Sequence, residues 1–270
     1  IVAVHYRSSN GDDVRLSAKY FVVAANGLET PKLLLISDVA NSSDQVGRNL
    51  MDHTGQGLQF LADEPVWPGR GAVQQGGIFN RRDGEFRKER ASVKHAFANN
   101  VPNMAVAGRL IEQGIFGKEL DERIRHDAAR WVDVSTVYET LPLASNTVRA
   151  STTRKDALGI PMLVVNYEVG DYVKAAKPGV DADYADFVKV MGGTVVEDNT
   201  GWQNRDHLMG TVIMGSDAQD SVVNHECRTF DHPNLFLATT GVIPASGTIN
   251  PTLTGVALSL RLADIIAREV

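Results

Sequence analysis

One stretch of the chain restricts the fold more than any other: an uninterrupted apolar run that stops at a glycine turn and leads into a helical pattern. The run covers residues 20–25, the turn is Asn26-Gly27, and the helical pattern covers residues 32–36. A strand that is apolar throughout is expected to be buried on both faces. The order strand, turn, helix brings backbone N–H groups close to a bound cofactor, although an ordinary strand-to-helix connection has the same pattern.

Two β runs, residues 1–7 and 14–25, are separated by a short polar segment that contains Asn10-Gly11. Asn-Gly between β runs is the strongest short signal for a hairpin. The first run has no preceding element that explains it, and the chain begins at Ile1 without a methionine. We therefore expect the chain to be the C-terminal piece of a longer polypeptide.

The composition favours a packed, folded protein and excludes several classes of function. The chain has 270 residues, of which 43% are hydrophobic and 22% charged, which suits one large domain or two modest ones. Its formal charge is −6 without a lysine or arginine run, so no nucleic-acid partner is expected. Cys227 is the only cysteine, which excludes an intrachain disulfide. No run approaches the ~20 apolar residues that cross a bilayer.

The residue pattern changes twice along the chain and so predicts three segments. Between about residues 47 and 202, short strands alternate with turns rich in glycine and proline, which indicates an α+β domain with an antiparallel sheet. Helices are expected there at 117–130 and 181–190, and strands near 132–141 and 146–151. The final segment returns to a buried strand at 234–238 and ends in a helix.

The last helix has a start signal at Asn250-Pro251. An asparagine side chain caps helix N-termini well, and proline suits the first helical position, so capping alone would explain Asn250. Apolar residues then follow with helical spacing at 253, 256, 257 and 260. The start of a helix also presents N–H groups and the positive end of the helix dipole, which suits an anionic cofactor.

His207, which opens the run 207–215, is the candidate catalytic base. Oxidation of an alcohol needs one group that takes the hydroxyl proton and one that orients the oxygen, and His207 and Asn250 would supply both. The alternative is a structural, hydrogen-bonded histidine. Asp206 is adjacent, but neighbours on a strand point to opposite faces, so no pairing with His207 is expected.

The other histidines are weaker candidates. His225-Glu226-Cys227 places alternate side chains together, but neither His53 nor His232 belongs to a second pair of ligands with metal-binding spacing. No metal site is predicted. The Gly-x-Ser-x-Gly turn of serine hydrolases is also absent.

Four segments in order, spread over nearly the whole chain, carry a family resemblance. They are residues 21–35, residues 46–53, residues 207–215, and the stretch from Asn234 through Pro244 to Asn250-Pro251-Thr252-Leu253. With these segments the chain resembles the C-terminal half of the glucose–methanol–choline (GMC) family of flavin-dependent oxidoreductases.

The resemblance implies an α/β fold with an α+β insertion: the C-terminal part of a Rossmann-like FAD-binding domain plus an antiparallel-sheet substrate domain. Residues 1–48 and 203–270 are expected in the FAD-binding domain, and residues 49–202 in the substrate-binding domain. The family's Gly-x-Gly-x-x-Gly turn for the ADP half of FAD belongs to the N-terminal half of the polypeptide and is missing here. The chain by itself is therefore expected to bind FAD weakly or not at all.

Carried over by motif, His207 is the catalytic base and Asn250 hydrogen-bonds the substrate hydroxyl while a hydride passes to flavin N5. Contacts with FAD are expected from Ala25, Asn26, Gly27, Thr239, Thr240, Gly241, Asn250, Pro251 and Thr252. Many family members have an acidic residue, a small residue and a serine where this chain has 239–241, so that acidic contact with FAD is not expected.

Residues 60–67 and 155–161 resemble the bacterial branch that contains gluconate, glucose, fructose and sorbitol dehydrogenase flavoprotein subunits. That branch implies a sugar, sugar acid or polyol substrate, a small subunit, a cytochrome c subunit, and electron transfer to a cytochrome or quinone. It also implies a peripheral location at the periplasmic face of the inner membrane. The alternatives are a cytoplasmic location, an oxygen-using oxidase of the same family, and a non-catalytic fragment that serves as a structural or binding domain.

Overall fold

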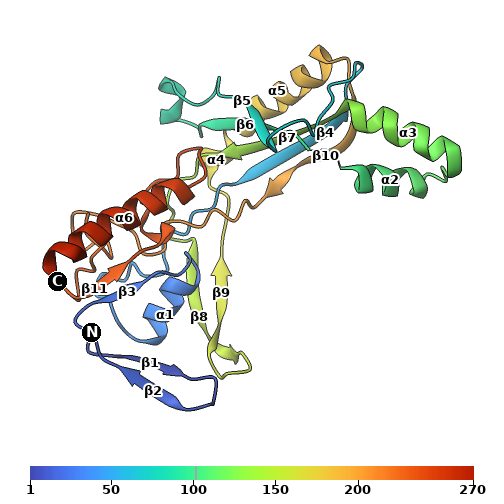
Figure 1. Cartoon of the computed structure of the whole chain (residues 1–270). Coiled ribbons are helices and arrows are strands. Elements are labelled where there is room, and N and C mark those ends of the chain that lie inside the picture. Colours follow the sequence, from blue (N-terminus) through green and yellow to red (C-terminus); the bar gives the residue numbers. More distant parts are fainter. Residues whose placement is uncertain (101) are drawn as a thin grey trace. The chain divides into compact units, whose positions relative to one another are not determined.

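The computed structural model describes residues 1–100 and 102–270, without the side chains of Gln74 and Gln75, and divides into two compact units (Figure 1). Unit 1 comprises Ile1–Asp52, Thr140–Gly170 and Asp206–Val270, and unit 2 comprises His53–Glu139 and Asp171–Arg205. The expected middle domain, residues 49–202, thus differs from unit 2 by a few residues at each end and by one long internal segment. Residues 140–170 pack with unit 1, where Val148 N–H donates to the Gly47 carbonyl (2.7 Å) and Leu50 N–H to the Asn146 carbonyl (3.0 Å).

The first hairpin of unit 1 forms where Asn10-Gly11 predicts it. Strands β1 (Val4–Arg7) and β2 (Asp13–Leu16) pair antiparallel, and Gly11 adopts φ +90°, which a turn glycine tolerates. The expected single strand over residues 14–25 is wrong, because the chain leaves the hairpin after Leu16 and starts a separate strand, β3 (Phe21–Val23).

Strand β3 pairs parallel with β11 (Leu235–Leu237), and helix α1 (Glu29–Ile36) follows β3 as predicted. All three residues of β11 are buried, which confirms the expected buried strand. Burial of β3 on both faces is wrong: Phe21 is buried, but Val22 is 47% exposed. Among the described residues, the core of unit 1 covers only one face of this strand.

Unit 1 is completed by the hairpin of β8 (Thr147–Lys155) and β9 (Pro161–Asn166), the short 3-10 helix η2 (Thr240–Val242) and the long helix α6 (Thr252–Glu269). Helix α6 buries Gly255 and Leu262 against the unit. The apolar residues whose spacing predicted the helix lie on its outer side, where Leu253 is 80% and Leu260 65% exposed. The helix is confirmed, but its buried face is a different one.

Unit 2 is built on the predicted antiparallel sheet, with strand order β10-β4-β7-β6-β5. Its strands are β4 (Gly55–Leu61), β5 (Gln74–Ile78), β6 (Val93–Ala98), β7 (Trp131–Tyr138) and β10 (Thr194–Gln203). Its helices are η1 (Glu85–Lys88), α2 (Asn103–Glu112), α3 (Gly117–Arg130), α4 (Asp171–Lys174) and α5 (Lys177–Val190). The helices expected at 117–130 and 181–190 are thus present.

Helix α5 covers one face of this sheet and anchors to it by a buried polar network. Its Asp183 carboxylate lies 3.0 Å from His95 Nε2 on β6, and its Tyr184 hydroxyl lies 2.5 Å from Thr136 Oγ1 on β7. Arg81 donates two hydrogen bonds to the same carboxylate (2.5 and 2.8 Å). Buried polar groups are stable when paired in this way, so the network fixes the position of α5.

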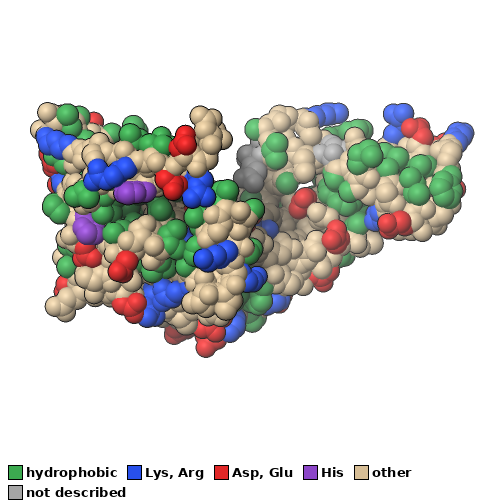
Figure 2. All heavy atoms as spheres, turned by 90° about the horizontal axis from the view of Figure 1, so that it is seen from below, with side chains coloured by type: hydrophobic (Ala, Val, Ile, Leu, Met, Phe, Trp, Pro, Cys, Tyr) green, Lys and Arg blue, Asp and Glu red, His purple; other side chains and the backbone are tan. Residues whose placement is uncertain are grey.

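The α2–α3 hairpin packs Val106 and Leu110 against Trp131 at one end of the sheet. It leaves Met104 86% and Phe116 63% exposed, and Figure 2 shows hydrophobic side chains gathered over this hairpin, on the right of the view. Within the described residues, no helix combines the length and apolar character needed to span a bilayer.

Candidate active site

The structure brings the two predicted catalytic residues into contact within unit 1. Asn250 Nδ2 lies 3.1 Å from His207 Nε2. An amide nitrogen is only a donor, so this contact requires an unprotonated Nε2, with the proton of the neutral ring on Nδ1. His207 is half-buried and Asn250 is exposed, so the pair can be reached from outside the unit. A neutral imidazole nitrogen beside an amide donor can bind a hydroxyl group, as an acceptor and a donor together.

The role of Asn250 as helix N-cap is not confirmed. Helix α6 begins at Thr252, and Pro251, not Asn250, occupies the N-cap position, where its side chain makes no capping hydrogen bond. The Asn250 amide points to His207 instead. The local sequence pattern could not distinguish the two uses, because the competing contact comes from a residue 43 positions away.

Three of the predicted segments pack together next to the His207–Asn250 pair. A Cβ atom on Gly27 would lie 3.0 Å from the Leu208 carbonyl oxygen, so the turn approaches the His207 segment more closely than nearly all Cβ contacts. Thr211 Oγ1 donates to the Gly27 carbonyl (2.6 Å), and Thr240 Oγ1 donates to the Leu208 carbonyl (2.7 Å). The turn after β3, the His207 loop and η2 therefore form one packed cluster.

A pocket of about 370 Å³ opens beside this cluster, at the carboxyl ends of β3 and β11 and along the start of α6. Its lining includes four of the residues predicted to contact the cofactor: Ala25, Thr239, Thr240 and Thr252. Small and hydroxyl-bearing side chains allow a flat group to lie close to the backbone. The carboxyl ends of parallel strands are where cofactors bind in α/β sheets.

The remaining predicted cofactor residues lie outside the lining of this pocket. Asn26 uses its side-chain oxygen to accept hydrogen bonds from the N–H groups of Leu28 and Glu29 (2.9 and 2.8 Å), which shapes the turn into α1. Gly27 and Gly241 support the cluster, since a Cβ on Gly241 would lie 3.0 Å from Thr211 Oγ1. Pro251 is buried at the start of α6. Contacts of these residues with FAD stay predictions.

The observed pocket fits part of FAD. The first helical hydrogen bond of α6 runs from Gly255 N–H to the Pro251 carbonyl (2.9 Å), so the N–H groups before Gly255 are left at the helix start. Together with the helix dipole they favour negative charge, which a reduced flavin carries. A volume of about 370 Å³ is at the lower end of ligand pockets, which suits a portion of a dinucleotide.

Asp52 contacts the His207 segment, and the sequence reasoning gave it no role. Its carboxylate accepts hydrogen bonds from the backbone N–H groups of His207 (2.8 Å) and Asp206 (3.1 Å). The expectation that Asp206 lies on a strand is wrong, because β10 ends at Gln203 and Asp206 adopts φ +57°. The signal was present, since Asp52 lies within residues 46–53, one of the four segments that carry the resemblance.

In unit 2, the sheet face opposite α5 is polar. Cross-strand pairing places Gln59 beside Asp133 and Glu197, and Gly57 beside Ser135 and Asn199, and partners in these rows point to the same face. Gln59, Asp133, Ser135 and Asn199 are all half-buried. Burial raises the pKa of the Asp133 carboxyl, against the opposing effect of a hydrogen bond from Gln59. The sheet face opposite α5 therefore carries a set of amide, hydroxyl and carboxylate groups.

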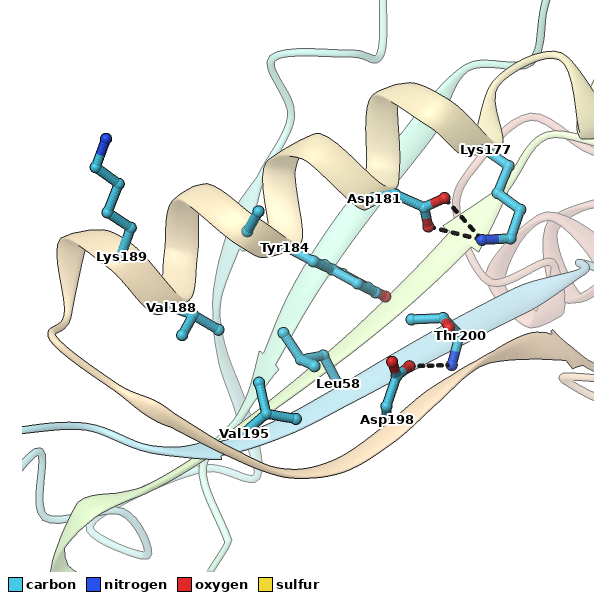
Figure 3. Close-up of a pocket in the computed structure, with 10 residues that line it drawn as sticks. Leu58, Lys177, Asp181, Tyr184, Val188, Lys189, Val195, Asp198 and Thr200 are labelled. Carbon is cyan, nitrogen blue, oxygen red and sulfur yellow. Dashed lines mark hydrogen bonds and ion pairs between the residues drawn. The ribbon is translucent and has the colours of Figure 1, made fainter.

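The α5-covered face holds a separate pocket of about 490 Å³ (Figure 3). Tyr184 points from α5 toward Leu58 on β4, with Val188 and Val195 beside it, and the Lys177–Asp181 ion pair lies at the helix start. Burial raises the pKa of Tyr184 to about 12, so its phenol stays protonated and acts as a hydrogen-bonding partner of Thr136. Sequence reasoning gave no signal for this pocket.

Comparisons with known proteins agree with the resemblance. The N-terminal and C-terminal family models of GMC oxidoreductases match residues 1–55 and 142–259. The large subunit of fructose dehydrogenase from Gluconobacter japonicus is 44% identical over 277 residues, covering 100% of this chain and 51% of that protein. A 2-methyl-1,2-propanediol dehydrogenase from Mycolicibacterium austroafricanum is 28% identical, covering 99% of this chain and 51% of that protein. The chain thus spans about half the length of these relatives.

Solved structures support the fold. Pyridoxine 4-oxidase from Mesorbium loti has a TM-score of 0.68 at 17% identity, covering 99% of this chain and 55% of that one. A formate oxidase has the same TM-score at 16% identity, covering 99% and 57%, and the FAD of the Aspergillus oryzae formate oxidase is the subject of a further neighbouring structure. The fructose dehydrogenase relative confirms the expected bacterial branch. The chain belongs to the GMC oxidoreductase family, whose cofactor is FAD.

Proposed function

We propose that this chain supplies the catalytic histidine and asparagine of a flavoenzyme that oxidises a CH–OH group of a sugar, sugar acid or polyol. The observation that carries the proposal is the 3.1 Å contact between His207 Nε2 and Asn250 Nδ2 beside the start of α6. In this proposal the N-terminal half of the family fold completes the FAD site. We call this chain together with that half the complete flavoprotein.

The geometry of the pair gives each residue a role. A substrate hydroxyl that replaces the direct contact between the two side chains donates its hydrogen to His207 Nε2 and accepts a hydrogen bond from Asn250 Nδ2. His207 then holds the hydroxyl proton, and Asn250 keeps the oxygen, and with it the reacting carbon, in one orientation. FAD, when bound, supplies the acceptor for the hydride. General-base help of this kind is typically worth about 10²–10⁴ in rate.

A polyhydroxylated substrate is supported by the names of the relatives, since fructose and 2-methyl-1,2-propanediol both carry more than one hydroxyl group.

Electron transfer to a cytochrome or quinone is part of the proposal. It is supported by the fructose dehydrogenase relative, which is a large subunit and so has further subunits. On this basis we propose a small subunit and a cytochrome c subunit as partners, at the periplasmic face of the inner membrane, with a cytoplasmic location as the alternative.

An oxygen-using oxidase is the second candidate. Paromamine 6'-oxidase from Streptomyces fradiae is 29% identical, and a C-glycoside 3-oxidase from Microbacterium trichothecenolyticum is 28% identical. The higher identity to a dehydrogenase favours the first candidate. Turnover of the complete flavoprotein with oxygen as the sole acceptor, compared with turnover with a quinone analogue or cytochrome c, separates the two.

The third possibility, a non-catalytic structural or binding domain, is tested by replacing His207 with alanine in the complete flavoprotein. His225 is an exposed histidine of the same unit, so His225→Ala is the matched control. We expect His207→Ala to lower kcat about 10²- to 10⁴-fold while His225→Ala leaves it unchanged. Wild-type turnover by His207→Ala would exclude the proposed role.

A further inference from the structure

We propose that Asp52 is a positioning residue, which holds the backbone of His207 and is linked through Thr140 and Ser246 to the segment that carries Asn250. This inference rests on the proposed function of the His207–Asn250 pair. It adds to that function a network of hydrogen bonds that fixes the distance between two catalytic side chains from different parts of the chain.

The first link is the carboxylate of Asp52. The residue is only 6% exposed, and its two oxygens bind consecutive N–H groups, Oδ1 that of His207 (2.8 Å) and Oδ2 that of Asp206 (3.1 Å). Asp206 lies in the left-handed region at φ +57°, which is costly for a residue with a side chain. A charged acceptor on both N–H groups stabilises this turn and sets the direction in which His207 leaves it.

The second link joins the backbone of Asp52 to Thr140. The Thr140 hydroxyl donates to the Asp52 carbonyl (2.9 Å), and Tyr167 donates to the same carbonyl (3.2 Å). Thr140 is 3% exposed, so water competes little for the hydrogen bond of its hydroxyl group. These bonds hold the backbone of Asp52, in addition to the bonds that its carboxylate makes.

The third link leads from Thr140 to the asparagine segment. Thr140 N–H donates to Ser246 Oγ (2.7 Å), and the Ser246 hydroxyl donates to the Thr140 carbonyl (2.9 Å). Ser246 opens the short stretch that ends at Asn250, directly before α6. A continuous chain of hydrogen bonds therefore runs from the backbone of His207 through Asp52, Thr140 and Ser246 to the loop that carries Asn250.

Such a network matters for rate because proton removal depends on the positions of both side chains. A displacement of about 1 Å at a reacting group costs up to about 10²-fold in rate. The two oxygens of the Asp52 carboxylate bind the backbone N–H groups of Asp206 and His207, so this carboxylate positions His207 through the backbone. Replacing Asp52 should therefore lower kcat and leave KM for the substrate largely unchanged.

The test uses Asp52→Asn in the complete flavoprotein, since the amide keeps the size of the side chain but turns one N–H acceptor into a donor. Asn146→Asp is the matched control. Asn146 is fully buried in unit 1, and its side chain also binds the backbone, accepting from the Glu168 N–H (2.9 Å) and donating to the Glu168 carbonyl (3.1 Å). We expect Asp52→Asn to lower kcat about 10- to 100-fold with little change in KM, and to increase the kinetic isotope effect of a substrate deuterated at the reacting carbon. Asn146→Asp is expected to lower thermal stability without these kinetic changes.

Repeating Asp52→Asn in a His207→Ala background separates positioning from general damage. If Asp52 acts through His207, the substitution changes the residual kcat of His207→Ala by a small factor only. Two outcomes overturn the positioning role alone. One is an equal loss of kcat in both backgrounds, and the other is a wild-type kcat in Asp52→Asn while His207→Ala is slow. Full turnover by His207→Ala overturns the proposed function, and the positioning role with it.

A second variant covers the case in which Asp52→Asn does not fold. Ser246→Ala removes one hydroxyl, breaks the link to Thr140, and leaves the Asp52 carboxylate in place. It is expected to lower kcat in the wild-type background and to have little effect when Asn250 is already alanine. A loss of the same size in both backgrounds overturns the link.

Discussion

Asn250 Nδ2 and His207 Nε2 lie 3.1 Å apart although 43 residues separate them in the chain. One side chain precedes the N-terminus of α6, and the other follows a left-handed turn that Asp52 holds. A hydroxyl group that replaces this direct contact would meet an acceptor and a donor at once. The chemistry that we propose follows from this relationship, and the surrounding hydrogen bonds explain how it is maintained.

The close approach of Gly27 to the His207 segment predicts a sensitive position. A Cβ on Gly27 would lie 3.0 Å from the Leu208 carbonyl oxygen and 3.1 Å from Leu208 Cβ, so Gly27→Ala should push apart the turn and the His207 segment. We expect weaker FAD binding and lower kcat together, measured by flavin fluorescence titration and steady-state kinetics of the complete flavoprotein. Gly201→Ala is the control, because a Cβ there meets nothing within 4 Å. Unchanged FAD affinity in Gly27→Ala would show that the two segments can separate freely.

The size of the pocket at α6 predicts that the 270-residue chain alone holds FAD poorly. Its lining comes from three segments, the end of β3, residues 238–240 and the first turns of α6, and its volume of about 370 Å³ suits only part of the cofactor. Purified alone, the chain should show little flavin absorbance and no saturable binding at micromolar FAD. Stoichiometric FAD in a preparation that contains no other polypeptide would contradict this prediction.

The network beneath α5 predicts that unit 2 loses stability in acid. Burial lowers the pKa of His95, although its bond to Asp183 opposes the shift. Burial alone would raise the pKa of Asp183, but hydrogen bonds from Arg81 and His95 outweigh it and lower the pKa. Both groups therefore contribute stability that is present above their ordinary pKa values, about 6.5 and 3.9, and lost as the pH falls.

Thermal unfolding of the complete flavoprotein between about pH 7.5 and pH 5.5, which lie one unit above and below the ordinary histidine pKa, measures the histidine part of this loss. The wild type should unfold at lower temperature as the pH falls toward the lowered pKa of His95. In His95→Gln the amide can still reach Thr136 or Asp183 but does not titrate, so the decrease should be smaller. The same decrease in both proteins would mean that other groups dominate acid unfolding.

The sequence predicted those elements whose pattern is local. The Asn10-Gly11 hairpin, the helices at 117–130 and 181–190, and the buried strand at 234–238 all form, because turn chemistry and residue periodicity act over a few neighbours. The burial of β3 could not be predicted in the same way. An apolar run shows that a strand can be covered on both faces, but the exposure of Val22 depends on which other segments pack there.

The candidate site shows the same division. Motif matching identified His207 and Asn250, but the capping pattern at Asn250-Pro251 favoured a local use that the structure does not show. The motif at residues 46–53 contains Asp52, but the contacts of its carboxylate could not be predicted, because they go to backbone N–H groups, which nearly every residue type provides. Contacts of this kind become visible only when distant loops are placed in three dimensions.

The most direct measurement of the central claim is a double-mutant cycle of His207→Ala and Asn250→Ala on kcat in the complete flavoprotein. Two side chains that bind the same hydroxyl act as a unit, so each single variant should be strongly impaired and the double variant little worse than His207→Ala alone. Losses that multiply in the double variant would show that the two residues act independently, and would contradict a shared role at one substrate oxygen.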